Sequence, residues 1–129
     1  MQTVPSETWL YWFTKEPPIA ESDRYGAFHA AEIGYVFGNV DLFGAVPTDV
    51  DHALSEVMAT VWTQFARTGN PNGEGLPDWP AYTPENEAYL EFGADTGARR
   101  GGLREAKMEL FERAWALQRE NARAQAETD

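Results

Sequence analysis

The clearest hydrophobic pattern along the chain predicts an amphipathic helix near its middle. Between residues 50 and 65 the apolar residues recur every three or four positions, which puts them on one helical face: Val50, Leu54, Val57, Met58, Val61, Trp62 and Phe65. Thr48 can cap the first turn, and Asp49 and Asp51 place negative charge at the positive end of the helix dipole. Residues 69–71, Gly-Asn-Pro, are expected to end this helix.

A continuous apolar run over residues 8–14, Thr-Trp-Leu-Tyr-Trp-Phe-Thr, indicates a different element. Both faces of this run are apolar, which predicts a strand buried on both faces, as in the middle of a parallel sheet. Residues 89–92 form a second, shorter strand candidate that Gly93 ends. The pattern offers at most these two strands and does not place them side by side. Residues 97–102 are interpreted as a surface linker.

The segments between these elements are predicted as loops and one short helix. Residues 19–25 are polar and are interpreted as a loop, whereas residues 26–39 are rich in Gly, Ala and aromatic residues and predict a tight turn followed by a short helix. Residues 70–84 contain several Pro and Gly. We expect them to form an ordered loop, because the aromatic side chains of Trp79 and Tyr82 would otherwise be exposed to solvent.

The C-terminal part predicts a second long helix. It should extend from about residue 103 to residue 122, with one apolar side: Leu103, Met108, Phe111, Ala114, Trp115 and Gln118. Residues 124–129 are expected to fray as a tail. The chain contains no internal repeat and no low-complexity segment.

Composition and charge narrow the class of partner. With 129 residues the chain is one domain at most. Its net charge of −11 would repel a phosphate backbone and an anionic bilayer, because both kinds of binding rest on Lys and Arg. No run approaches the roughly 18 apolar residues that a membrane helix needs. We therefore expect neither nucleic acid nor a membrane as a partner.

Neither the cysteine content nor the first residues identify the cellular compartment of the protein. The chain has no Cys, which excludes a disulfide framework and a thiolate nucleophile. Residues 1–5 lack the basic and apolar regions of a secretory signal. The compartment stays open on this ground, and a cytoplasmic location would follow if residue 1 is the natural N-terminus.

Two histidines are the side chains that titrate near neutral pH. His52 falls in the first turn of the predicted central helix, among acidic residues, and is interpreted as a solvated surface residue. His29 lies among small residues, which leaves room for another group to approach its ring. A His in such a turn, just beyond a buried strand, is where open α/β sheets place catalytic groups. Taken alone, however, the pattern fits a core histidine better.

Neither a metal site nor a complete nucleophilic site follows from these residues. His29 and Glu32 could share one helical face, but two ligands do not complete a metal sphere and no second cluster exists. We therefore expect no metal and no cofactor. The serines, Ser6, Ser22 and Ser55, all lie outside a G-x-S-x-G turn. The chain carries a plausible base without its nucleophile.

Four short motifs follow one another along the chain. They read YWFTKEPP at residues 11–18, GAFHAAEIGYVFGN at residues 26–39, WTQFARTGNPN at residues 62–72 and WPAY at residues 79–82. In this order and spacing they resemble the C-terminal part of the type B carboxylesterases, the family that includes the cholinesterases and the bacterial para-nitrobenzyl esterases. The similarity extends from about Trp9 to the final helix.

The resemblance implies an α/β fold and ester hydrolysis by a Ser-Glu-His triad. Residues 1–129 would be the C-terminal portion of an α/β-hydrolase domain, incomplete as an independent sheet. His29, the histidine of the G-A-x-H motif, would be the general base that takes the serine proton and returns it to the leaving alcohol. A small carboxylic ester would be the substrate of the complete enzyme. Glu32, Tyr35 and Phe37 match family positions that look structural.

The resemblance also implies parts that this chain lacks. The nucleophile elbow, the glycine-rich oxyanion loop and the catalytic acid of the family lie upstream of the matched region, and no segment here resembles them. The chain is therefore not expected to assemble a triad by itself. A two-faced strand and two amphipathic helices need partners, which would be the rest of the esterase fold or a second copy meeting the apolar helix faces.

Two other interpretations stay open beside the esterase segment. The chain could be an esterase-derived interaction module without chemistry, in which case His29 would be silent. It could also be a truncated remnant that folds poorly. Trp9, Trp12 and Phe28 could form an apolar wall near His29, although aromatic residues of this kind are more often simply core.

Overall fold

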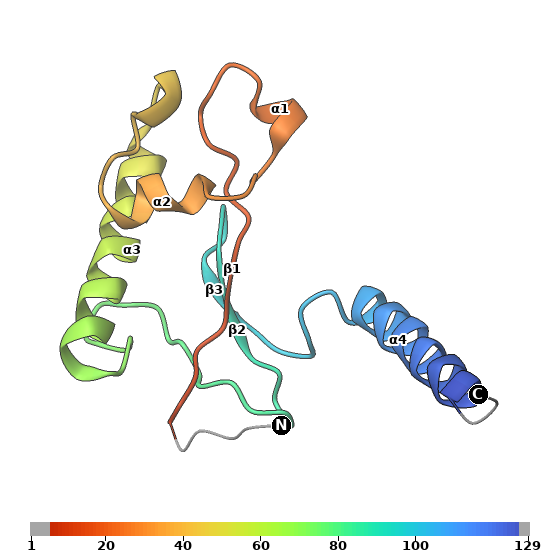
Figure 1. Cartoon of the computed structure of the whole chain (residues 1–129). Coiled ribbons are helices and arrows are strands. Elements are labelled where there is room, and N and C mark those ends of the chain that lie inside the picture. Colours follow the sequence, from red (N-terminus) through yellow and green to blue (C-terminus); the bar gives the residue numbers. More distant parts are fainter. Residues whose placement is uncertain (1–5, 127–129) are drawn as a thin grey trace.

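The computed structural model describes residues 6–126, with the side chain of Phe43 left aside (Figure 1). Over these residues the chain forms a mixture of helices and strands. In chain order they are β1 (Tyr11–Phe13), α1 (Ser22–Tyr25), α2 (Ala31–Val36), a 3-10 turn (Leu42–Gly44), α3 (Asp49–Thr68), β2 (Tyr89–Phe92), β3 (Gly97–Arg99) and α4 (Glu105–Ala126).

The strands form one three-stranded sheet in the order β1-β2-β3. Strand β1 pairs in parallel with β2, with Tyr11 opposite Leu90, and β2 pairs antiparallel with β3. Both predicted strands are confirmed, but they are direct neighbours because α2 and α3 form the crossover between them. The linker predicted over residues 97–102 is wrong in its first half, where residues 97–99 turn back along β2 as a hairpin strand.

The two faces of the sheet have different surroundings. Side chains alternate along a strand, and those of Tyr11, Phe13 and Phe92 point to the α3 side. On the opposite face Trp12 packs edge-on against Tyr89, with ring centroids 6.3 Å apart, and stays partly exposed. The prediction that this strand is buried on both faces in mid-sheet is therefore wrong for the described residues. It is an edge strand covered by a helix on one side.

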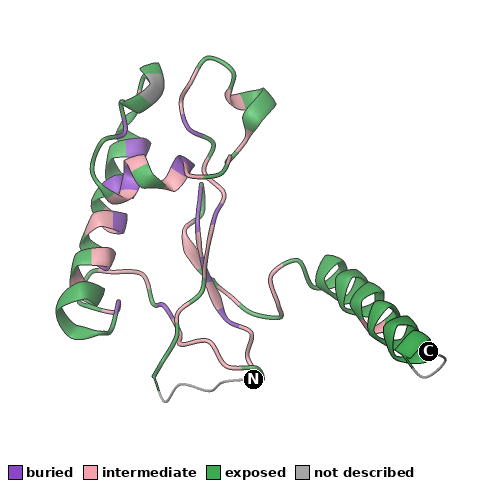
Figure 2. Ribbon diagram, in the orientation of Figure 1, coloured by how far each residue is buried: buried purple, intermediate pink, exposed green. Residues whose placement is uncertain are grey.

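Helix α3 contributes Leu54, Met58 and Val61 to the core, as its hydrophobic pattern predicts (Figure 2). These residues, together with others from α2, the sheet and two connecting segments, form one cluster: Phe13, Ala31, Tyr35, Val40, Leu54, Met58, Val61, Trp79, Leu90 and Phe92. Two residues of the predicted apolar face, Val50 and Phe65, are exposed because they lie near the helix ends, beyond the sheet.

Local signals set the ends of α3. The backbone N–H and the hydroxyl of Thr48 both donate to the Asp51 carboxylate, at 2.9 and 2.6 Å, so that the first turn is closed by a capping box. Gly69 ends the helix with a φ of 74°, a conformation that residues with a Cβ adopt at a cost. Both ends of the predicted helix are thus confirmed.

The connecting segments follow the sequence-based expectations except in one place. The short helix predicted within residues 26–39 is confirmed as α2. The loop over residues 70–84 is ordered, because Asn72 accepts a hydrogen bond from the Trp79 backbone N–H at 2.7 Å and the Trp79 indole donates to the Leu10 carbonyl at 2.9 Å. The loop predicted over residues 19–25 is wrong in part, since its last four residues form the single helical turn α1.

Helix α4 confirms the predicted C-terminal helix but buries none of its residues. Figure 1 shows it projecting away from the sheet and α3. Residues 124–126, which we expected to fray, are its last turn, and residues 127–129 lie outside the described residues. Within residues 6–126, no helix is both long and apolar enough to span a bilayer.

Candidate functional site

His29 lies in the turn between α1 and α2, two residues before α2 begins. The turn leaves α1 at Gly26 and enters α2 through hydrogen bonds from Phe28 N–H to the Gly26 carbonyl and from Ala31 N–H to the Phe28 carbonyl, at 3.0 and 3.1 Å. Figure 1 shows α2 beside the end of β1. This is the edge of a parallel pair where α/β folds carry their functional groups.

The backbone beside His29 is strained. Ala30, the residue before α2, has a φ of 72° and a ψ of 6°, which is the left-handed region. A residue with a Cβ in this region costs roughly 1 kcal/mol or more. Strain of this kind clusters at functional sites, where the surrounding structure holds it in place. The strained residue here directly follows the candidate base.

The His29 imidazole is exposed, and among the described residues it makes no hydrogen bond or ion pair. The expectation of a core histidine, drawn from the local pattern alone, is therefore wrong. His52 is also exposed, in the first turn of α3, as predicted. Of the two histidines, only His29 lies in a strained turn, the one that leads into α2.

None of the hydroxyl groups in residues 6–126 is bonded to His29. The Ser55 hydroxyl is buried and donates to the Tyr35 carbonyl at 2.7 Å, so it is committed to structure. Nor do three or more His, Asp or Glu side chains in this range gather closely enough to hold a metal ion. The described residues therefore assemble neither a triad nor a metal centre around His29.

The sequence patterns did not predict a cluster of buried polar side chains next to α2. The Asp51 carboxylate, 1% exposed, accepts a hydrogen bond from the Tyr35 hydroxyl at 2.6 Å and pairs with the Lys15 ammonium at 2.8 Å. Thr48 adds the two capping bonds. The Thr-x-x-Asp spacing signals the capping role of Asp51, but no local pattern links it to Lys15 and Tyr35, which lie 36 and 16 positions earlier.

The electrostatics of this cluster follow from its contacts. Burial alone would raise the pKa of the Asp51 carboxyl, but hydrogen bonds from Lys15, Thr48 and Tyr35 outweigh it and hold that pKa well below its usual range. Burial and the bond to this carboxylate raise the pKa of the Tyr35 hydroxyl above its usual range. The cluster is therefore a carboxylate bound by neutral and cationic donors throughout the neutral range.

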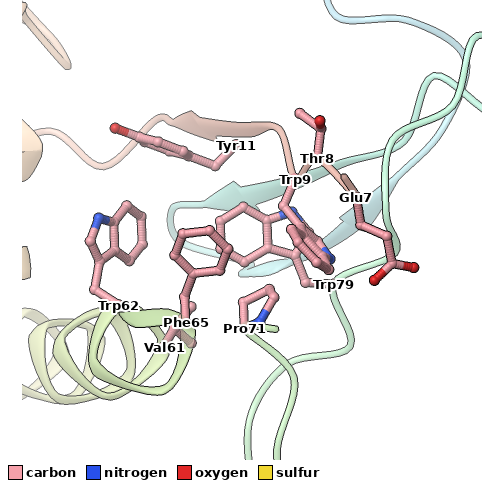
Figure 3. A pocket seen from close by; sticks show the side chains of 9 residues that line it. All are labelled: Glu7, Thr8, Trp9, Tyr11, Val61, Trp62, Phe65, Pro71 and Trp79. Carbon is pink, nitrogen blue, oxygen red and sulfur yellow. The ribbon is translucent and has the colours of Figure 1, made fainter. Parts of the chain in front are cut away.

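An aromatic cavity of about 290 Å³ lies between α3, the 70–84 loop and the segment of residues 7–11 (Figure 3). Figure 3 shows side chains from β1 and the residues before it, from α3 and from the 70–84 loop around it: Glu7, Thr8, Trp9, Tyr11, Val61, Trp62, Phe65, Pro71 and Trp79. The Trp9 indole N–H is buried without a hydrogen-bond partner in the described structure. His29 is not part of this lining.

The apolar wall considered for His29 is not assembled from the three aromatic residues named. Trp9 packs edge-on against Phe65 at 5.7 Å and belongs to the aromatic cavity. Trp12 lies on the opposite face, where the Arg104 guanidinium stacks over its ring at 5.3 Å. Phe28 lies next to His29 in the chain and packs against Tyr25. The period-2 alternation of β1 puts Trp12 on the face away from α2 and α3, and Trp9 is placed in the cavity instead.

Comparison with protein families gives one assignment. A model of the carboxylesterase family, described as "Carboxylesterase family", matches residues 1–111. Among curated proteins, the chain is 40% identical over 94 residues to a liver carboxylesterase of Sus scrofa, covering 70% of this chain and 16% of the relative. It is 46% identical over 106 residues to a medium-chain fatty acyl-CoA hydrolase precursor of Anas platyrhynchos, covering 80% and 18%.

Solved structures give the same answer for the fold. A thermophilic PNB esterase superimposes with a TM-score of 0.69 at 31% identity, covering 81% of this chain and 22% of that protein. The carboxylesterase of Geobacillus stearothermophilus gives 0.60 at 35% identity, covering 73% and 20%. These neighbours are α/β-hydrolase esterases, and the small sheet with its helices is consistent with part of that fold. The chain spans less than a fifth of the length of the curated relatives it matches.

Proposed function

The chain belongs to the carboxylesterase family, and on this premise we propose that it supplies the general-base histidine, His29, of a carboxylic-ester hydrolase. The serine nucleophile and the catalytic acid would come from a segment that this chain does not contain. One observation carries the proposal. His29 is an exposed imidazole with no partner among residues 6–126, in a strained turn that leads into α2, the helix whose Tyr35 ring packs on the last residue of β1.

The geometry fits a general base whose hydrogen-bonding partners come from another segment. A general base must reach the proton it abstracts, and its second ring nitrogen must be oriented by another group. An exposed imidazole on a fixed turn leaves both nitrogens available for these contacts. Within the complete enzyme, His29 would take the proton of the serine hydroxyl and then deliver it to the departing alcohol.

The substrate class is a small carboxylic ester. The relatives of this chain include a carboxylesterase and a fatty acyl-CoA hydrolase, and both names denote the hydrolysis of acyl compounds. Acyl transfer through a serine needs no metal or organic cofactor. The residues that select the acyl and alcohol groups would lie mainly in the other segment.

The first experiment is the mass of the native product in its source, captured with an antibody against residues 104–120. A product several times heavier than 14.4 kDa that hydrolyses short esters supports the proposal. In that product, His29→Ala should lower kcat by about 10⁴-fold or more, because the serine loses its base. Folding should change little, since the side chain is exposed.

His52→Ala is the matched control. Its imidazole is exposed on α3 and outside the strained turn, so the variant should keep full turnover. Full ester hydrolysis by the His29→Ala variant would contradict the proposed role of His29.

A second candidate function, an interaction module without chemistry, is favoured by α4. Its large apolar residues stay exposed on the described surface: Met108, Leu110, Phe111, Trp115 and Leu117. Such a face drives association with the rest of an esterase fold or with a second copy. A native product of 14.4 kDa that binds no serine-directed phosphonate probe, yet sediments as an oligomer, would favour this function over catalysis.

A further inference from the structure

We propose that Asp51 is a positioning residue for His29. Through Tyr35 and Lys15 it fixes helix α2, and with it the turn that carries the imidazole, against the carboxyl end of β1. This inference rests on the proposed function, because fixing the turn affects a reaction only if His29 is the base.

Two hydrogen bonds hold α2 onto α3 through a single residue. The Tyr35 hydroxyl donates to Asp51 Oδ1 at 2.6 Å, and the Tyr35 carbonyl accepts from the Ser55 hydroxyl at 2.7 Å. A helix of six residues, Ala31–Val36, is far too short to hold its conformation in water by itself. Its orientation is therefore set by these contacts and by burial of Ala31 and Tyr35.

The same carboxylate is tied to the sheet. The Lys15 ammonium lies 2.8 Å from Asp51 Oδ1, and Lys15 is the second residue after β1. The ring of Phe13, the last residue of β1, packs against the Tyr35 ring with centroids 5.2 Å apart. Strand end, α2 and the start of α3 thus meet at one buried side chain.

The burial of a charged side chain at position 51 favours a positioning role for Asp51 over a purely stabilising role. A buried ion pair contributes little net stability compared with apolar residues of similar volume, because both charges must be desolvated. Its bonds are directional, however. Asp51 is bound by Lys15 after β1, by Tyr35 from α2 and by Thr48 before α3. These bonds restrict how the three elements can be oriented relative to one another. Of these three residues, Lys15 and Tyr35 are the titratable groups that contact Asp51.

His29 stands two residues before α2, so a tilt of α2 moves the imidazole. The helix is short and the intervening Ala30 is held at a left-handed φ, which couples the turn to the helix without a flexible spacer. A displacement of about 1 Å at a catalytic group can cost roughly 100-fold in rate, because the reacting atoms leave their aligned geometry.

The test uses Tyr35→Phe and Asp51→Asn in the complete enzyme that carries this sequence, beside His29→Ala. Tyr35→Phe removes one hydroxyl and keeps the ring that packs on Phe13, so it should fold even if Asp51→Asn does not. We expect Tyr35→Phe to lower kcat about tenfold while KM stays within about twofold, since the ester pocket is untouched. The double variant should be no slower than Asp51→Asn, because both remove the same link.

Thr68→Ala is the matched control, because its hydroxyl bonds the Gln64 carbonyl at the far end of α3, at 2.8 Å, and it should keep full kcat. If Tyr35→Phe lowers the melting temperature but keeps kcat, Asp51 is structural only and the inference fails. If His29→Ala keeps turnover, the proposed function fails instead, and the positioning role falls with it. Loss of turnover in His29→Ala with full kcat in Tyr35→Phe overturns the positioning role alone.

Discussion

At the residue scale, the Asp51 carboxylate shows how one side chain takes part in several levels of structure. In the sequence it is a favourable charge in the first turn of a helix, and this role is confirmed by its bonds to Thr48. In the fold it is also the buried acceptor for Tyr35 and Lys15. These bonds determine how its protonation is linked to stability.

The lowered pKa of Asp51 predicts a loss of stability in acid. The folded chain holds this carboxyl ionised to lower pH than the unfolded chain does, so its contribution is complete above the ordinary Asp range, near pH 4. The contribution disappears as the pH falls below that range. Urea unfolding at pH 7, 5 and 3 should show Asp51→Asn less stable than the wild type by about 2 kcal/mol at pH 7.

The difference in the free energy of unfolding between the wild type and Asp51→Asn should become smaller towards pH 3. At that pH it costs free energy to keep the wild-type carboxyl ionised in the folded state. Asp49→Asn is the control, since Asp49 occupies the same turn but is exposed. If the free energies of unfolding of the wild type and Asp51→Asn differ by the same amount from pH 7 to pH 3, Asp51 is not the group whose protonation is linked to stability.

At the element scale, the β1–β2 pair depends on close contact where the two strands end. The Thr14 backbone N–H donates to the Phe92 carbonyl at 2.8 Å, and its hydroxyl donates to Glu91 Oε1 at 2.9 Å. The other oxygen of Glu91 receives the Arg99 guanidinium of β3 at 3.1 Å. A polar chain therefore runs across all three strands, and Gly93 leaves room for it.

Gly93→Ala should weaken this pair. A Cβ at position 93 would overlap Thr14 Oγ1, so the hydroxyl must leave its bond to Glu91. We expect a loss of about 1–2 kcal/mol in the free energy of unfolding, measured with urea at pH 7. Removing the hydroxyl in Thr14→Ala relieves the overlap, and the double variant should lose less than the sum of the single losses.

Gly97→Ala is the control within the same sheet. Its Cβ would meet only the end of the Arg99 side chain, at 3.1 Å, which can move aside. A Gly93→Ala variant as stable as the wild type would show that the strand ends are looser than the structure has them.

At the scale of the whole molecule, α4 is the part without a partner. Arg104, the residue before α4, lies over the Trp12 ring, but Phe111 and Trp115 of the predicted apolar side are 52% and 51% exposed. The rest of the described chain has a core of its own, built by α2, α3 and the sheet. The apolar side that the sequence predicts for α4 is present, yet nothing among residues 6–126 covers it.

The isolated chain should therefore associate through α4. Sedimentation should show species heavier than 14.4 kDa, and Phe111→Glu together with Trp115→Glu should shift them towards the monomer, because charges on that face oppose its burial. Glu120→Gln, on an exposed position of the same helix, should leave the distribution unchanged. A monomeric wild-type chain at the highest concentration tested would contradict this prediction.

The sequence by itself determined what depends on near neighbours along the chain. The period of the apolar residues and the Thr48 and Gly69 ends fixed α3, and the four motifs identified the family and singled out His29. These signals act over a few residues, where helix geometry and capping bonds are local. Tertiary structure decided the pairing of β1 with β2, the third strand, the exposure of His29 and the meeting of Lys15, Tyr35 and Asp51. Each of these joins residues from separate elements, and such contacts depend on how the elements pack, which no local pattern records.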